Sequence, residues 1–366
     1  MTLKTLIDDF RDDLGATRDH LKSIDYKNRN IYIFGVGGAA STYHRCFKTE
    51  NIEPCAFLDN DPSKQGKKFC GVDVIAPSDV KDRDNALVLI CSTKPNVNEF
   101  AFKQSRELEM PAINLDRFVY SLNLNMLLDN INLFEDDESA ETYIKMIKRL
   151  TLSEKNLGGG EIPFTDEQYF AVSSFKERSP DEVFADCGAF VGDTIERYLF
   201  NREGTFKKIY AFEPTARTFK ALSARSERLR REWALNDDQI TLVEAGVDRV
   251  TQSKYLQADG GSGLANKLSD DPNAGVEIKT IALDDYFAEQ SISFLKADIE
   301  GYELDMLKGA EKVIRRDRPK MAICIYHSVS DRFRVQQWIN NLGLGYKFAV
   351  RHHYVKLEET VLYAWQ

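Results

Sequence analysis

Two segments of this 366-residue chain place a glycine-rich turn directly after a short apolar run, IYIFGVGGAAS at residues 31–41 and VFADCGAFVGDT at residues 183–194. A strand that ends in such a turn and continues into a helix is typical of nucleotide-binding α/β folds. The chain is also longer than the roughly 100–200 residues of a typical domain. We therefore expect two Rossmann-like α/β domains, at residues 1–120 and 181–366, joined by a helical linker at residues 121–180.

Apolar runs and amphipathic stretches alternate in both halves. Residues 1–28 carry apolar side chains on one helical face, and the run 86–91 is apolar throughout, as expected for a central parallel strand covered on both faces. Further strands are predicted at residues 31–34, 54–58, 208–212, 240–245, 292–297 and 321–326. The last two candidates, 346–350 and 361–365, have no helix between them and predict a terminal antiparallel hairpin.

In the second glycine turn an acid precedes the glycines. The spacing is DxGxxxG, whereas the dinucleotide fingerprint has no acid there and rests the phosphates on a helix amino terminus. A carboxylate at that place would repel a pyrophosphate and would suit a cationic ligand such as S-adenosylmethionine. An acid at the end of the next strand could bind two ribose hydroxyls, and the loop after the third strand could reach the adenine. The predicted cofactor-binding residues are Asp186, Gly188, Gly192, Glu213, Glu244 and Ala245.

Acidic and histidine side chains end the fourth and fifth strands, where open α/β sheets hold reactive groups. Asp298 is the leading candidate to orient an acceptor or take its proton, because methyl transfer mainly requires alignment. Glu300 either joins this chemistry or caps the following helix, and His327 either accepts the proton or binds a backbone carbonyl. His352 and His353 are more readily explained as structural residues than as members of the reactive site. No HxH or CxxC spacing supports a metal, so none is expected.

This half of the chain resembles the FkbM family of methyltransferases in four segments, VFADCGAFVGDT, IYAFEPT, FLKADIEGYELDMLKGAEKVI and ETVLYA. The similarity extends over about Asp166–Gln366 and includes DEQYF at its start. It implies a class I methyltransferase fold, a doubly wound sheet ending in the antiparallel hairpin, and usually O-methylation of a sugar or natural-product hydroxyl. Asp298, Glu300 and Gly301 match the family's acidic DIEG motif. Tyr326 stands where members of that family often carry an acid before the histidine.

The first glycine turn has the full dinucleotide context. Gly35 and Gly37 fit GxGxxA directly after a strand, and Asp59 ends the next strand 24 residues past Gly35. This permits NAD or a nucleotide sugar, and the continuation at residues 57–80 resembles Rossmann-like modules attached to sugar-modifying enzymes. No YxxxK pair follows within this domain, so the short-chain dehydrogenase machinery is missing from it. We expect either a bound nucleotide or nucleotide sugar, or an empty structural domain.

Charge and composition exclude several classes of protein. The net charge of −9 arises from 49 basic and 58 acidic residues without long runs of either sign, which argues against a nucleic-acid binder. No apolar stretch approaches the about 20 residues that span a bilayer, and the start lacks a signal-peptide core, so we expect a soluble cytoplasmic protein. Six cysteines without a CxxC pair are expected to be reduced thiols packed as small hydrophobes. A homo-oligomer is compatible with the sequence.

The leading hypothesis is an S-adenosylmethionine-dependent O-methyltransferase that acts on a sugar or glycan-precursor hydroxyl. Residues 158–175 and the glycine-rich loop 259–275, which is long enough to act as a lid, are expected to form the acceptor pocket. The alternative is a nucleotide-sugar- or NAD-binding protein whose N-terminal domain is the active one. A third hypothesis is a non-catalytic interaction protein that has kept the fold.

Overall fold

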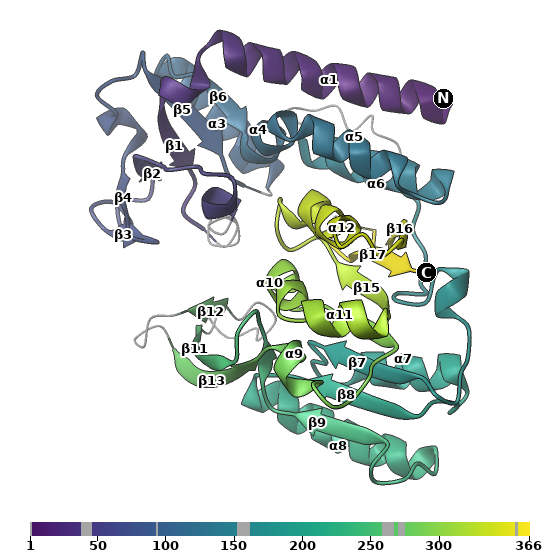
Figure 1. The fold of residues 1–366 in the computed structure, drawn as a ribbon. Helices are drawn as coiled ribbons and strands as arrows, with labels where there is room; N and C mark the ends of the chain where they lie inside the picture. The colour runs from purple at the N-terminus through teal and green to yellow at the C-terminus, as the bar shows by residue number, and fades with distance from the viewer. Residues whose placement is uncertain are drawn as a thin grey trace. The chain divides into compact units, whose positions relative to one another are not determined.

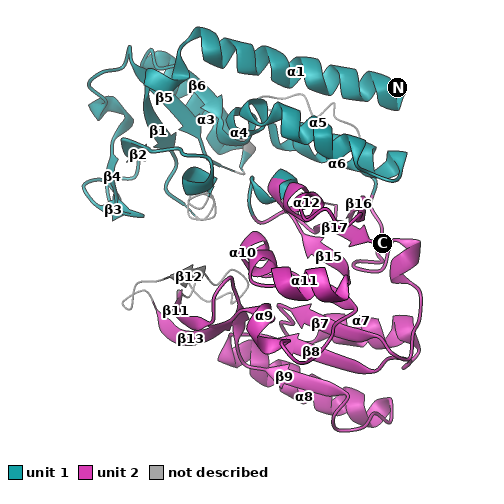
Figure 2. Cartoon of the chain, in the orientation of Figure 1, with its two compact units in different colours: residues 1–163, 328–333 teal, residues 164–327, 334–366 magenta. Residues whose placement is uncertain are grey.

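The computed structural model describes residues 2–37, 46–92, 94–151, 162–257, 267–269, 275–355 and 358–366. The chain forms two compact units (Figure 2): Met1–Pro163 with Ser328–Phe333 is unit 1, and Phe164–His327 with Arg334–Gln366 is unit 2. Both units carry a sheet with helices, which confirms two α/β domains. The segment expected as a linker, 121–180, is instead divided between the units at residue 163.

Unit 1 is built on a six-stranded sheet with the order β3-β4-β2-β1-β5-β6 (Figure 1). The strands are β1 (Asn30–Phe34), β2 (Ala56–Leu58), β3 (Lys68–Phe69), β4 (Val72–Ile75), β5 (Ala86–Ile90) and β6 (Ala112–Asn114). They pair in parallel except for β3, which is antiparallel to β4. Every residue of β5 is buried, so the continuous apolar run is a central strand as predicted.

The helices of unit 1 pack through their apolar faces. The hydroxyl of Thr2 accepts the N–H of Thr5 and caps α1 (Leu3–Ser23), which buries apolar side chains at helical spacing. This helix packs against α4 (Leu115–Leu122), α5 (Leu124–Asn132) and α6 (Asp137–Thr151). The unit also contains α3 (Pro95–Glu107), η1 (Tyr26–Asn28) and η2 (Pro77–Asp79). Because α4 to α6 bury apolar faces here, most of the expected linker is part of this domain.

Unit 2 contains a seven-stranded sheet with the order β16-β17-β15-β14-β7-β8-β9 (Figure 1). The strands are β7 (Val183–Cys187), β8 (Lys208–Phe212), β9 (Ile240–Val243), β14 (Phe294–Ala297), β15 (Lys320–Cys324), β16 (Lys347–His352) and β17 (Thr360–Trp365). Pairing is parallel from β9 to β15, whereas β17 is antiparallel to both of its neighbours, which confirms the terminal hairpin. The strand order reverses between β7 and β14, and ligands of open α/β sheets bind beside such a point.

Helices connect these strands. Unit 2 also contains a second, small sheet, which was not predicted from the sequence. The connections form η3 (Ser173–Phe175), α7 (Asp193–Arg202), α8 (Ala216–Glu232), α9 (Leu283–Tyr286), α10 (Glu303–Lys308), α11 (Glu311–Asp317) and α12 (Asp331–Asn341). The small sheet has the order β10-β13-β11-β12, with β10 (Gly246–Val247), β11 (Gln252–Gln257), β12 (Lys267–Ser269) and β13 (Val276–Ile281). Most of the expected lid, residues 259–266 and 270–274, lies outside the described residues, as do residues 158–161.

The structure bears on two expectations drawn from composition, one about the cysteines and one about membrane-spanning segments. None of the six cysteines forms a disulfide; four are buried, as expected, whereas Cys55 and Cys70 are exposed. Across the described ranges, none of the helices is long and apolar enough to cross a membrane.

Candidate functional site

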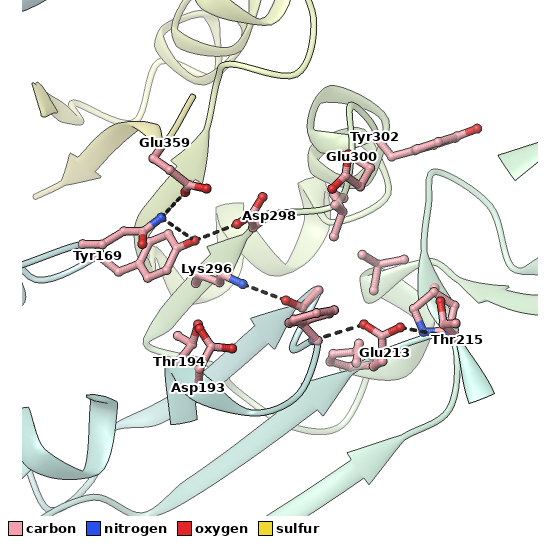
Figure 3. Close-up of a pocket in the computed structure, with 18 of the residues that line it drawn as sticks. Tyr169, Asp193, Thr194, Glu213, Thr215, Lys296, Asp298, Glu300, Tyr302 and Glu359 are labelled. Carbon is pink, nitrogen blue, oxygen red and sulfur yellow. Dashed lines mark hydrogen bonds between the residues drawn. The ribbon is translucent and has the colours of Figure 1, made fainter. Parts of the chain in front are cut away.

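A cavity of about 320 Å³ lies in unit 2 at the carboxyl ends of β7, β8 and β14 (Figure 3). This is the edge at which an open α/β sheet binds its ligand. The carboxylates of its described lining are Asp193, Glu213, Asp298, Glu300 and Glu359. Its apolar side chains are Phe190, Phe212, Pro214, Val247, Leu256 and Ile299. The cavity therefore combines apolar surface with an excess of acids.

Two of the predicted cofactor-binding residues, Gly188 and Glu213, line this cavity. Gly188 has φ of 78°, and a Cβ there would lie 1.9 Å from the carbonyl oxygen of Asp298, so only glycine fits. Glu213 is 6% exposed, and its carboxylate accepts the backbone N–H groups of Phe190, at 3.1 Å, and Thr215, at 2.8 Å. These bonds fix the carboxylate at the cavity wall (Figure 3).

Asp186, which was expected to face a cationic ligand, is fully buried and does not belong to the described lining. The register of β14 against β7 pairs it with Lys296, whose Nζ lies 3.0 Å from Asp186 Oδ1 and donates to the carbonyl of Gly188 at 2.8 Å. Burial alone would lower the pKa of Lys296, but the charges of Asp186 and Asp298 raise it overall. The acid thus neutralises a lysine of the neighbouring strand, which the spacing of the glycine turn does not reveal.

Three further predicted cofactor residues are placed elsewhere. Gly192 is buried at the start of α7, outside the described lining. Glu244 is exposed and Ala245 is buried, and neither lines the described cavity. The two residues that follow them, Gly246 and Val247, line it instead, because the chain turns into β10 there.

Asp298 faces the cavity and is held by two tyrosines. The hydroxyl of Tyr169 donates to Oδ2 at 2.8 Å, and that of Tyr326 donates to Oδ1 at 3.2 Å (Figure 3 draws the first). Burial would raise the pKa of Asp298, but the charges of His327 and Lys296 lower it below its usual value. Asp298 is therefore a charged acceptor of fixed orientation, which is what positioning of a substrate hydroxyl requires.

Both ring nitrogens of His327 face carboxylates. Nδ1 lies 2.8 Å from Glu303 Oε1, and Nε2 lies 3.3 Å from Asp298 Oδ1 and 3.8 Å from Glu300 Oε2. Burial alone would lower the pKa of His327, but Glu303 and then Asp298 raise it to about 10. The described partner of Nδ1 is thus a buried carboxylate. The expectation that His327 binds a backbone carbonyl is not met among the described residues.

Glu300 and Glu303 take different places in the loop after β14. Glu300 lines the cavity, where partial burial and the charge of Asp298 outweigh the opposing charge of His327 and raise the pKa of its carboxyl to about 7. The alternative role of Glu300 as a helix cap does not fit, since α10 begins at Glu303 and its N-cap is Tyr302. Glu303 is fully buried, and its Oε1 also accepts the N–H of Ile299 at 3.0 Å.

Among the lining residues that were not predicted as site residues are Tyr169, Lys296, Tyr326 and Glu359. Lys296 could have been found as the single charge within an apolar strand. The hydroxyl of Tyr326 lies between two carboxylates, because Glu359 Oε1 accepts from it at 3.4 Å in addition to Asp298. Tyr169 lies in the segment 158–175 that was expected to form the acceptor pocket, and Glu359 begins the ETVLYA segment of the family resemblance, but neither was singled out, because they reach the site from segments distant in the chain.

His352 and His353 have structural roles, as expected. His352 is 1% exposed, and its Nδ1 lies 2.9 Å from the hydroxyl of Thr360. Nδ1–H of His353 donates to the carbonyl of Thr165 at 2.8 Å, and its Nε2 accepts from the hydroxyl of Tyr363 at 2.9 Å. These bonds require the neutral ring of His353, and burial, with smaller effects of nearby positive charges, lowers its pKa to about 4.

His353 should therefore make stability depend on pH. The unfolded chain takes up the proton at a pKa near 6.5, whereas the folded chain takes it up only near 4, so the contribution is full above pH about 6.5 and is lost as the pH falls towards 4. Urea unfolding at about pH 7.5 and about pH 4.5 should show the wild type losing about 2–3 kcal/mol more than His353→Gln. Equal losses in the two proteins would contradict the neutral buried ring.

The glycine turn of unit 1 is closed by its own acid. Gly35 has φ of 109°, and a Cβ there would lie 3.0 Å from the carbonyl oxygen of Cys91. Asp59 Oδ2 accepts the N–H of Val36 at 3.1 Å and pairs with Lys64 Nζ at 2.9 Å, so the predicted ribose-binding acid is already engaged. Gly37 follows in the turn, and residues 38–45, which would complete the motif, lie outside the described residues.

Comparison with known proteins gives a family for most of unit 2. Residues 186–350 match the family described as methyltransferase FkbM domain, and residues 27–100 match the family described as C2185-like, N-terminal. None of the curated proteins compared with the chain matches it.

One solved structure has a similar fold over nearly the whole chain, and others overlap about half of it. Methyltransferase FkbM from Methylobacillus flagellatus KT is similar with a TM-score of 0.58 and 20% identity, over 97% of this chain and 99% of that chain. An rRNA methylase from Streptococcus thermophilus is similar over 51% of this chain and 89% of its own, with a TM-score of 0.32 and 16% identity. Fibrillarin from Aeropyrum pernix, solved with natively bound S-adenosyl-L-methionine, overlaps 51% of this chain and 67% of its own, with a TM-score of 0.31 and 14% identity.

Proposed function

Since residues 186–350 form a methyltransferase domain of the FkbM family, we propose that this protein is an S-adenosylmethionine-dependent O-methyltransferase whose acceptor is a hydroxyl of a sugar or glycan precursor. The cavity at the strand ends of unit 2 carries this proposal. Its described lining holds five carboxylates but only two basic side chains, Arg197 and Lys296, and Lys296 is already paired with Asp186. An acidic cavity favours a cationic donor over a dinucleotide, whose phosphates it would repel.

Glu213 and Gly188 are the residues that would hold the donor. Glu213 ends the strand next to β7, and its fixed carboxylate would accept hydrogen bonds from ribose hydroxyls. Gly188 keeps the backbone free of a Cβ beside the cavity. The apolar side chains of Val247 and Leu256 line the same cavity and would pack against the adenine.

The donor, when bound, supplies a methyl group that leaves sulfur and forms a bond to the acceptor oxygen. The protein must therefore orient the acceptor hydroxyl and accept its proton. Asp298 supports this role, because its carboxylate is held by two tyrosine hydroxyls at the cavity wall. The neighbouring acids Glu300 and Glu359 favour a neutral hydroxyl over an acceptor with a phosphate or carboxylate at the reacting end.

Glu213→Ala should weaken binding of S-adenosylmethionine at least tenfold, about 1.4 kcal/mol, because the ribose partner and the bonds to two backbone N–H groups are lost together. Isothermal titration calorimetry on the full chain measures this change. Glu227→Ala is the matched control, because that side chain is 63% exposed on α8 and should leave the affinity unchanged. Equal affinities of Glu213→Ala and the wild type would remove Glu213 from the donor site.

For unit 1, the glycine turn that follows β1 supports a proposal that it holds a nucleotide or nucleotide sugar. A mass spectrum of small molecules that co-purify with the full chain tests this directly. A nucleotide or nucleotide sugar in that spectrum supports the proposal. Repeated preparations without such a molecule would favour a purely structural domain.

A further inference from the structure

A cluster of one histidine and three carboxylates follows β14 and β15 in unit 2, in which the side chains of Glu303 and His327 are buried, that of Asp298 is partly buried and that of Glu300 is exposed. Atoms of Asp298, Glu303 and His327 that can bind a metal lie within 4.8 Å of one another. Glu300 Oε2 lies 3.8 Å from His327 Nε2, close to the 3.3 Å that separates this nitrogen from Asp298 Oδ1. Ligands bound at about 2.1 Å around one ion are themselves about 3.0–3.4 Å apart, so the separation of Asp298 Oδ1 and His327 Nε2 is that of two ligands, whereas Glu300 would have to move closer to complete the sphere.

The hydrogen bonds of His327 leave one nitrogen directed at this cluster. Its side chain is only 7% exposed, and Nδ1 donates to the fully buried Glu303. Nε2 is buried and has no hydrogen-bond partner among the described residues, although carboxylates lie near it. Metal-bound histidines commonly donate their second nitrogen to a carboxylate, which fixes the tautomer and directs the lone pair at the ion. The pair of Glu303 and His327 has this arrangement.

The charge of the cluster also favours a cation. Asp298, Glu300 and Glu303 surround His327, and Glu359 contacts the same group of side chains through Tyr326. Three carboxylates thus lie within 3.8 Å of one imidazole, and Lys296, the nearby lysine, pairs with Asp186. Even a protonated histidine leaves a negative excess in this cluster, which another positive charge would reduce.

We propose that Asp298, Glu300 and His327 Nε2 bind a divalent cation, which displaces the proton of Nε2 into solvent, with Glu303 holding the imidazole in the binding orientation. The mixed oxygen and nitrogen ligands suit an ion such as Mn²⁺. Such an ion at the cavity wall would polarise an acceptor hydroxyl and make its proton easier to lose. The cation site goes beyond the proposed function, since it can be measured without donor or acceptor.

The test is a titration of Mn²⁺ into the chelator-treated full chain, followed by electron paramagnetic resonance of the free ion. We expect one equivalent to bind, and we expect Glu303→Gln and Asp298→Asn to weaken binding by about 10- to 100-fold. Glu311→Gln is the matched control, because Glu311 is 42% exposed on α11 and pairs only with Arg315 among its described ion pairs. Its affinity for Mn²⁺ should equal that of the wild type.

A measurement on the wild type guards against variants that fail to fold. Electron spin echo modulation of bound Mn²⁺ should show coupling to a histidine nitrogen. Saturable binding without nitrogen coupling, equal affinity in all variants, or no binding up to about 1 mM Mn²⁺ would each overturn the proposed site. Calorimetry with S-adenosylmethionine on metal-free protein gives a separate result, so failure of the cation site and failure of the donor site can be distinguished.

Discussion

Replacing Asp186 by alanine is expected to lower the free energy of unfolding by about 3–5 kcal/mol, because it leaves the charge of Lys296 buried without its partner. Asp186 is 0% exposed and Lys296 is 1% exposed, and the two charged groups lie 3.0 Å apart. Urea unfolding of unit 2, followed by circular dichroism, measures the change.

A double variant separates loss of the pair from loss of packing. Asp186→Ala with Lys296→Met removes both charges and should recover most of the stability, because apolar replacement of a buried ion pair is often nearly neutral. The exposed pair of Arg315 and Glu311, 2.9 Å apart, is the control, and Glu311→Ala should cost less than about 1 kcal/mol. An Asp186→Ala variant as stable as the wild type would show that the buried pair is not a structural requirement.

Replacing Asp298 by asparagine is expected to lower methyl-transfer turnover by about 100- to 10,000-fold, the range for loss of a positioned proton acceptor. Asparagine keeps the size of the side chain but removes the charge and the capacity to take a proton. The tyrosine hydroxyls of Tyr169 and Tyr326 would remain to hold the substituted side chain. Transfer of a radiolabelled methyl group to sugar acceptors measures turnover, and calorimetry on the same samples should show a much smaller effect on donor affinity.

Asp305→Asn is the matched control for this substitution. Asp305 lies on α10, its side chain is 44% exposed, and its carboxylate pairs with Lys308 across one helical turn. It should leave turnover unchanged. Turnover of Asp298→Asn within about threefold of the wild type would exclude Asp298 from the chemistry.

Much of the fold could be predicted because its signals are local. The apolar runs that became β5 and β14, the glycine turns at Gly35 and Gly188, and the closing hairpin each follow from short stretches of sequence. The small sheet of β10 to β13 was missed because β10 and β12 have only two and three residues and β13 is exposed at three of its six positions, so neither length nor apolar pattern marks these strands. The assignment of α4 to α6 to unit 1 depends on packing partners far away in the chain, which periodicity does not identify.

The residues of the candidate site were predicted only where a local signal, the end of a strand, identified them. Residues at strand ends, such as Glu213 and Asp298, came out at the cavity because parallel strands end at one edge of the sheet. Asp186 also ends a strand, but its side chain meets Lys296 across the sheet, and strand register cannot be obtained from spacing alone. Tyr169 reaches Asp298 from before the first strand of unit 2, and only the folded chain reveals such a contact.

Titration of S-adenosylmethionine into the full chain in a calorimeter tests whether the cavity of unit 2 is a donor site. We predict saturable binding with a Kd in the micromolar range, about −8 kcal/mol, that weakens at least tenfold in Glu213→Ala and is unchanged in Glu227→Ala. No saturable heat up to about 1 mM donor, from protein whose fold is confirmed by circular dichroism, would contradict the claim.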